Sequence, residues 1–497
     1  MTRKGLALLS VLIWAGLFVL PVAALMVECS HGLLEMGSAA YSLLWSKVGF
    51  TAWQASVSSI LSGVLGLLWG LPLARYPRAQ AWLRVPFGVP TLAAVAAWAS
   101  LLSGTWIEYS AWAVIVAHVA FNVPWVALAV AQASASVPQV WSECARTLGA
   151  GWLHRLRAVV WPVIGPAWLG AMAQVFSFCA SSFVIVMVLG GGPPVETLET
   201  AIYSSVRTGI LDLGMATRLA VCQLILSLLP WWAVRIFFGR TQLRAQKLGA
   251  LPGGIREPAF APAVASLWAG VWVLPYVFFL KDLRWPESGW GVFWSALHFP
   301  IFVSIGIAAC VSFFSVVWAG ASVVLIHGSG LRVWVEALLL LPSGVSTLTL
   351  CMGFWLAYSR WVDPFEGSLV ALIAIQTVVF FPLVFRSFLP LARASPVRLW
   401  ELARSHGATP WQAFWSVEWP RWRAPVWSSL AMVSAASLGE VAAVGFFGSE
   451  KLVTVSGLVA RWMGSYRFEQ AGILVAVILG VSMVLSLLPT VAKWDRA

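Results

Sequence analysis

Two polar windows in an otherwise apolar chain share one pattern, Glu-x-Ala-Arg-x-x-Gly. The matching residues are Glu143, Ala145, Arg146 and Gly149 in the first window and Glu401, Ala403, Arg404 and Gly407 in the second. On a helix, the glutamate and the arginine three residues later lie on one face. The alanine and glycine leave a smooth face that another surface can approach closely, and the glycine can end the helix in a left-handed turn. For one window alone, a solvated surface ion pair is the alternative interpretation.

The two windows belong to a repeat of the whole chain. Pro162 and Pro420 close the windows, and their separation, 420 − 162 = 258 residues, also superposes Pro138 on Pro396 and Gly190 on Gly448. Two windows in register at matching positions argue against incidental surface charges. The sequence therefore predicts two copies of one unit, each with a short polar helix, and we expect each proline to mark the turn back toward the next span.

One further acidic residue lies well inside an apolar stretch. Glu440 has Ser182 as its repeat counterpart (440 − 258), which carries no charge. An ionised carboxylate at the centre of a membrane costs about 2.5–3.5 kcal/mol on insertion scales, so Glu440 is expected to face a cavity or a partner. Glu440 and Ser182 are therefore candidates for a translocation path. For Glu440 a structural or gating role is favoured over binding a cationic substrate.

No other constellation supports catalysis or a cofactor. The six cysteines are scattered without a Cys-x-x-Cys pair, the histidines are isolated, and we expect neither a metal nor a cofactor. The chain has no Gly-x-x-x-x-Gly-Lys loop, so nucleotide chemistry has to come from another subunit. A polytopic membrane enzyme is disfavoured because no nucleophile, base or metal ligands gather near one interface.

The elements that carry these residues are predicted to be membrane-spanning helices. The 497 residues are 60% hydrophobic and 10% charged, against about 25% charged residues in globular domains. Tryptophan, with 32 copies, is abundant, as expected at membrane–water interfaces. We predict an all-α fold of about twelve helices, at 6–27, 50–74, 86–103, 111–133, 167–190, 213–236, 263–281, 300–326, 333–357, 367–391, 426–447 and 470–492.

The distribution of basic residues predicts the orientation. With the N-terminus inside, most of the 31 lysines and arginines fall in the inner loops, which places both termini in the cytoplasm. This bias explains the net charge of +12 without a nucleic-acid partner. Six helices per copy is an even number, so the copies run in the same direction about an axis along the membrane normal. Both windows then face the cytoplasm, which suits a two-fold symmetric partner.

The pattern Glu143-Ala145-Gly149-Pro162, repeated at Glu401, resembles the EAA loop of ABC importer permeases. This resemblance implies a type I permease fold in which each loop forms a coupling helix seated on one subunit of a cytosolic ATPase dimer. It also implies a bacterial inner-membrane location and a periplasmic binding protein that delivers a small molecule. The chain departs from the family pattern at Cys144 and Leu402, where the family has a second alanine, and this puts the tightness of docking in doubt.

Softer motifs resemble fused double permeases of thiamine or thiamine phosphate transport. They are the stretches 118–124, 178–183, 189–193, 199–203, 447–448 and 463–467. Ferric-iron permeases share the fused layout and remain an alternative. An ion-coupled secondary transporter is less favoured, because it is expected to carry several intramembrane carboxylates or histidines, and this chain offers essentially one.

The expected organisation follows from the repeat. Residues 1–47 hold the first helix and a periplasmic loop, 48–238 the first permease domain, 239–262 a cytoplasmic linker, 263–297 the seventh helix with its loop, and 298–492 the second permease domain. Charged residues of the outer loops are either a docking surface for a binding protein or solvated loop charges. They are Glu196, Glu199, Asp212, Arg461, Arg467 and Glu469.

Overall fold

The computed structural model describes residues 3–32, 37–74, 80, 83, 89–207, 211–247, 261–283, 290–326, 332–393, 397–465 and 467–494. Across these ranges the chain is helical and forms no strand, as predicted. Within these ranges, seven helices are long and apolar enough to cross a membrane. Four shorter apolar helices, together with α20, occupy the remaining positions of the predicted twelve.

The first half begins with one long helix and ends with another. Its helices are α1 (Arg3–Trp14), η1 (Ala15–Val19), α2 (Leu20–Gly32), α3 (Ser38–Leu73), α5 (Thr91–Leu102), α6 (Ala111–Ala135), α7 (Gln139–Thr147), α8 (Trp152–Arg155), η4 (Leu156–Val160), α9 (Trp161–Ala180), α10 (Val184–Leu189), α11 (Leu198–Arg207) and α12 (Leu213–Lys247). α12 runs into the segment expected to be the linker, most of which lies outside the described residues.

The second half repeats this order. Its helices are α13 (Ala261–Lys281), α14 (Trp290–Ile326), α15 (Arg332–Leu339), η5 (Leu341–Gly344), α16 (Thr347–Tyr358), α17 (Leu369–Arg393), α18 (Val397–Ser405), α19 (Pro410–Ala413), η6 (Phe414–Glu418), α20 (Trp419–Leu438), α21 (Ala442–Phe447), α22 (Val455–Gly464) and α23 (Phe468–Trp494). The 258-residue offset maps α7 onto α18, η4 onto η6 and α10 onto α21 without a residue of difference. The predicted repeat is confirmed for these elements, whereas η1 of the first half and α15 and η5 of the second have no counterpart among the described residues.

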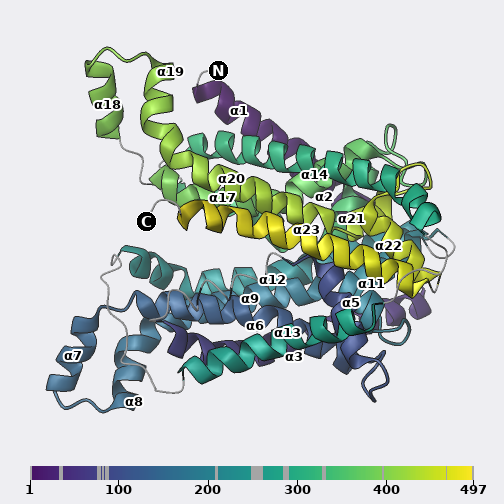
Figure 1. Cartoon of the computed structure of the whole chain (residues 1–497), viewed down its shortest axis with the longest axis horizontal. Coiled ribbons are helices and arrows are strands. Elements are labelled where there is room, and N and C mark those ends of the chain that lie inside the picture. Colours follow the sequence, from purple (N-terminus) through teal and green to yellow (C-terminus); the bar gives the residue numbers. More distant parts are fainter. Residues whose placement is uncertain are drawn as a thin grey trace.

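The two halves run in the same direction. In Figure 1, α7 and α8 of the first half and α18 and α19 of the second half lie at one end of the molecule, where both chain termini also lie. The short helices α11, α21 and α22 lie at the opposite end, where the halves come together. This arrangement agrees with the predicted pseudo-two-fold axis along the long helices.

The first helix of each half packs against the other half. α1 and α2 lie along α14 and α16, and α13 lies along α5. Trp318 donates from Nε1 to the Ser10 carbonyl at 3.3 Å, and the Tyr358 hydroxyl donates to the Gly16 carbonyl at 2.7 Å. In the other direction, Trp272 donates from Nε1 to the Ala120 carbonyl at 3.0 Å. This exchange holds the halves together within one chain.

Three predicted spans are broken where one continuous helix was expected. The span at 333–357 divides between α15 and α16, because η5 and Ser346, whose side chain caps α16, interrupt it. The spans at 167–190 and 426–447 end early, at Ala180 and Leu438. The apolar runs continue through these breaks, so hydropathy alone could not locate them.

The prediction that Pro162 and Pro420 mark turns is wrong. Both prolines lie in the first turn of a helix, α9 and α20, that continues directly from a π-helical turn. The Trp161 amide donates to the Leu156 carbonyl, five residues back, and the repeat has the same shift at Trp419. A proline has no N–H to donate, so each one leaves a helical hydrogen bond unmade, and the π-helical turn before it is a local irregularity in an otherwise continuous helix. The helices therefore extend back to Trp152 and Pro410.

Candidate functional site

Each polar window folds as a short helix that ends in a left-handed glycine. Gly149 and Gly407 both have φ of +81°. The Gly149 amide donates to the Arg146 carbonyl at 3.0 Å, and the Ala150 amide donates to the Ala145 carbonyl at 2.9 Å. The second window repeats both bonds at 3.0 and 3.1 Å. This is the Schellman arrangement, in which glycine avoids the steric cost that a side chain meets at positive φ.

The polar residues of both windows face away from the helix bundle. Glu143, Arg146, Glu401 and Arg404 are exposed, while Ala145 and Ala403 are half-buried. A side chain built on Gly149 or Gly407 would meet no atom within 4 Å. The windows thus present a charged edge and an open, smooth turn to the surroundings, as the sequence predicts.

Large apolar side chains surround the same turns, a feature that the sequence reasoning missed. Leu148 is 87% exposed, Leu402 54% and Trp411 68%. Exposed apolar groups beside a charged edge are typical of a surface that another protein covers. The windows contain apolar residues next to the charged positions, but their sequence alone does not reveal which of these residues are exposed.

The α7–α8 and α18–α19 hairpins lie apart from each other at one end of the molecule (Figure 1). α7 packs against α8 and η4, and α18 packs against α19 and η6, so each short helix is attached to the long helix that follows it. A force on α7 or α18 is therefore delivered to α9 or α20, which run through the bundle. The geometry suits transmission of movement from one end to the other.

Glu440 and Ser182 lie at matching breaks, between α20 and α21 and between α9 and α10. The Glu440 Oε1 atom accepts hydrogen bonds from the Ala442 amide at 2.8 Å and the Ala443 amide at 3.1 Å. Its carboxylate thus caps the N-terminus of α21, where the helix dipole favours negative charge. Ser456 anchors the backbone of the break by donating from Oγ to the Glu440 carbonyl at 2.8 Å. Both side chains at the breaks are half-buried.

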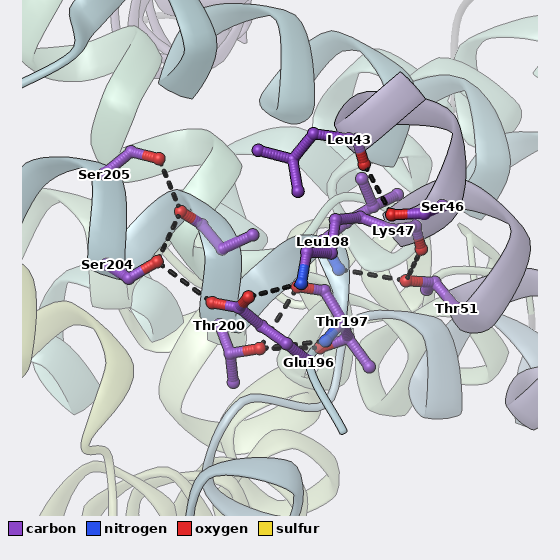
Figure 2. Close-up of polar contacts among 11 residues, drawn as sticks. Leu43, Ser46, Lys47, Thr51, Glu196, Thr197, Leu198, Thr200, Ser204 and Ser205 are labelled. Carbon is purple, nitrogen blue, oxygen red and sulfur yellow. Dashed lines mark hydrogen bonds and ion pairs between the residues drawn. The ribbon is translucent and has the colours of Figure 1, made fainter. Parts of the chain in front are cut away.

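Polar contacts fix the loop between α10 and α11 against α3 (Figure 2). Lys47 on α3 pairs with Glu196 at 2.5 Å, and Ser204 donates to the other oxygen of Glu196 at 3.0 Å. Thr51 accepts from the Leu198 amide at 2.9 Å and donates to the Lys47 carbonyl at 2.7 Å. These contacts fix the position of the start of α11, and this in turn sets the orientation of the side chains along that helix.

The outer-loop charges differ in their surroundings. Glu196 is paired with Lys47, and Glu199 is only 1% exposed. Asp212 accepts from the Met215 amide at 2.8 Å, which caps α12. Arg461, Arg467 and Glu469 are exposed on the second half. Burial of Glu199 rules it out as a docking residue in this conformation.

Arg207, at the end of α11, joins the two halves. Its guanidinium donates to the Gly448 carbonyl at 2.7 Å and to the Pro364 carbonyl at 3.2 Å, both in the second half. It also lies over the Phe365 ring, 5.5 Å from the centroid. These contacts are at the end opposite α7 and α18 (Figure 1). The repeat counterpart of Arg207 is Ser465 (207 + 258), so the first half alone supplies this clasp.

Each half of the chain matches the same family of known proteins. Residues 62–242 and 262–492 both match the family described as "Binding-protein-dependent transport system inner membrane component". The thiamine transport system permease protein of Brucella abortus (strain 2308) is 27% identical over 504 residues, covering 92% of this chain and 89% of that protein. Its counterpart in Escherichia coli (strain K12) is 24% identical over 477 residues, covering 88% and 87%. The sulfate transport system permease protein CysT of Salmonella typhimurium is 30% identical over 255 residues, covering 45% of this chain and 89% of that protein.

Proposed function

Because the chain belongs to the family of binding-protein-dependent transport system inner membrane components, we propose that it is the permease of an ATP-driven thiamine importer. It is a multi-pass inner-membrane protein and a transport subunit rather than an enzyme. The proposal of thiamine as the substrate rests on the similarity to thiamine permeases of several bacteria over about nine-tenths of the chain. Thiamine phosphates belong to the same proposal.

The coupling helices α7 and α18 are proposed to seat on a cytosolic dimer of ATP-binding subunits. Two equivalent surfaces at one end of the molecule fit a two-fold symmetric partner. The exposed Leu148, Leu402 and Trp411 supply apolar area for that contact. Both termini lie at this end, so they are cytoplasmic in this proposal (Figure 1). A periplasmic binding protein delivers the substrate to the opposite end.

The contacts between the two halves indicate how the transporter would open and close. At the end away from α7 and α18, the first half contacts the second through Arg207. At the α20–α21 break, Gly439 of the second half closely approaches Pro90 of the first, because a Cβ placed on Gly439 would lie 2.5 Å from the Pro90 Cβ. This conformation is closed toward the binding protein. Closure of the ATPase dimer brings α7 and α18 together, and the linked α9 and α20 then separate the halves at the far end, which admits the substrate.

The substrate is tested by growth of a thiamine auxotroph that lacks its own thiamine permease. Expression of this chain with its ATPase and binding protein is expected to restore growth on low external thiamine. The matched controls are auxotrophs that depend on sulfate or ferric-iron uptake. Rescue of either control in place of the thiamine strain would keep the transport class and replace the substrate.

We expect Arg207→Ala to release the outer closure. The clasp consists of two hydrogen bonds from a charged group and a cation–π contact, whose partial loss costs about 1–2 kcal/mol. Such a loss raises the outward-open population by roughly 5- to 30-fold. The measurement is ATP hydrolysis by the assembled importer without its binding protein, which should rise several-fold. Arg461→Ala, an exposed arginine at the same end, is the control and should change nothing; equal rates for Arg207→Ala and the parent would refute the clasp.

A further inference from the structure

Two acidic side chains from opposite halves lie on neighbouring elements. Glu199 belongs to α11 of the first half and Glu440 to the α20–α21 break of the second half. Tyr203 of α11 packs against Gly445 of α21, so these two helices are in contact. Burial and, to a smaller extent, the negative charge of Glu440 raise the pKa of the Glu199 carboxyl group to about 8. The sequence placed Glu199 on an outer loop and Glu440 inside a span, so it gave no reason to pair them.

Glu199 is buried with one carboxyl oxygen left without a partner. It is 1% exposed, and its Oε1 atom has no hydrogen-bond partner. Ser346, the residue that caps α16, interacts with the carboxyl group, but no lysine or arginine of the described residues pairs with Glu199 or with Glu440. A buried carboxylate is costly unless it is paired, so burial favours the protonated form of Glu199, and a bound cation would stabilise the charged form in place of the proton.

An aromatic pair borders the two carboxylates. Tyr203 follows Glu199 by one turn of α11 and therefore lies on the same face of the helix. Its ring packs against Phe183, with centroids 5.0 Å apart, and reaches within 3.3 Å of the position of a Cβ on Gly445. Gly445 is on α21, the helix that Glu440 caps. Aromatic faces beside carboxylates favour an organic cation, because the ring quadrupole attracts a weakly hydrated positive charge.

We propose that Glu199 and Glu440 receive the positively charged ring of an organic cation between the two halves, with Tyr203 as the aromatic wall. This inference rests on the proposed function, in which the substrate is thiamine, whose thiazolium ring is such a cation. Ser182, the counterpart of Glu440, is uncharged, so the pair of carboxylates is formed once and one cation is bound. Glu199 forms the main ion pair with the cation. Glu440 contributes less, because its Oε1 atom also accepts the hydrogen bonds that cap α21.

The position of the site suits alternating access. The contact between Glu199 and Ser346 crosses from the first half to the second, and α11 and α21 both lie at the end away from the coupling helices (Figure 1). Separation of the halves at this end breaks the contact and opens Glu199 to the arriving substrate. Return to the present conformation encloses the cation between α11 and α21.

The test measures binding of N-methylthiazolium to the full-length permease in lipid nanodiscs, from ligand-induced shifts in melting temperature. The neutral ring thiophene is the comparison ligand. The variants Glu199→Gln and Glu440→Gln remove the charge and keep the shape and the acceptor oxygen. Glu450→Gln, an exposed acidic residue on the loop after α21, is the matched control.

The parent and Glu450→Gln are expected to bind the cation more tightly than thiophene. Glu199→Gln should weaken cation binding by about ten-fold or more, which corresponds to about 1.4 kcal/mol. Glu440→Gln should weaken it by a smaller factor, and thiophene binding should stay the same in all four proteins, which shows that the fold is kept. A parent that does not prefer the cation, or a Glu199→Gln variant with the parent's preference, would overturn the inference.

This assay contains no thiamine, ATPase or binding protein, so its result is independent of the proposed substrate. Thiamine uptake by a parent that does not bind the thiazolium cation would overturn the cation site and leave the proposed function. Cation binding that is lost in Glu199→Gln, without thiamine uptake by the parent, would support the site and overturn the proposed substrate.

Discussion

Replacement of both Gly149 and Gly407 by tryptophan is expected to abolish ATP-dependent uptake while the helix bundle stays folded. Each glycine has φ of +81°, where a residue with a Cβ atom is strained by roughly 1–2 kcal/mol. Because no atom lies within 4 Å of either added Cβ, the indoles would project outward from the coupling helices into the space that the ATPase is proposed to occupy. Uptake into vesicles and ATP hydrolysis should both fall at least 100-fold, a loss of about 2.7 kcal/mol.

Gly104→Trp is the matched control for this double variant. Gly104 has φ of +72°, is exposed and also has no atom within 4 Å of an added Cβ, but it precedes α6 and so lies at the opposite end of that helix from α7. The control carries the same backbone strain and the same bulk away from the ATPase. Normal coupling in the double variant, or an equal loss in Gly104→Trp, would contradict the role given to the two turns.

Gly66→Leu is expected to prevent formation of a stable bundle. A Cβ on Gly66 would overlap the Cβ and Cγ1 atoms of Val126, and one on Gly70 would lie 2.5 Å from the Ala127 carbonyl oxygen. Small residues in membrane helices permit such close backbone approach, and α3 and α6 form the most extensive helix–helix contact among the described residues. Overpacking here should cost about 3 kcal/mol or more, because backbone atoms cannot move aside.

The measurement is the melting temperature and the monodisperse fraction of the detergent-purified protein. Gly49→Leu is the control on the same helix, at an exposed position where an added Cβ meets nothing. The control should behave like the parent, whereas Gly66→Leu should aggregate or melt many degrees lower. A Gly66→Leu protein as stable as the control would show that α3 and α6 are not packed as described.

The features that the sequence could predict are those fixed by local pattern. The 258-residue repeat, the short helices Gln139–Thr147 and Val397–Ser405, and the left-handed glycines that follow them all depend on residues within one or two turns. The common direction of the two halves follows from an even number of spans. Each of these features depends on helix geometry and hydropathy, which neighbouring residues determine.

The features that the sequence could not predict depend on distant contacts. The exchange of α1 and α13 between the halves is fixed by pairs such as Trp318 with Ser10, 308 residues apart. The breaks before α10 and α21 fall inside apolar runs, where a hydrophobic segment gives no boundary. The neighbours of Glu199 in the sequence indicate a loop charge, but the structure buries this residue where α11 packs against α12, α3 and α16 of the other half.

The role of Glu440 illustrates both limits. Its position inside an apolar stretch predicts a partner, and the structure supplies one in the amides of α21. The structural role favoured on sequence grounds therefore has a physical basis. The neighbouring position of Glu199 in the other half suggests a second role for Glu440, in binding the substrate cation. This role could not be inferred from either half alone, and it stays a prediction.

The most direct test of the account is uptake of radiolabelled thiamine by vesicles that hold this chain with its ATPase and binding protein. The vesicles are supplied with ATP, with a proton gradient, or with neither. We expect accumulation that requires ATP and the binding protein and that a proton gradient cannot replace. Thiamine uptake driven by the gradient without ATP would contradict the importer account.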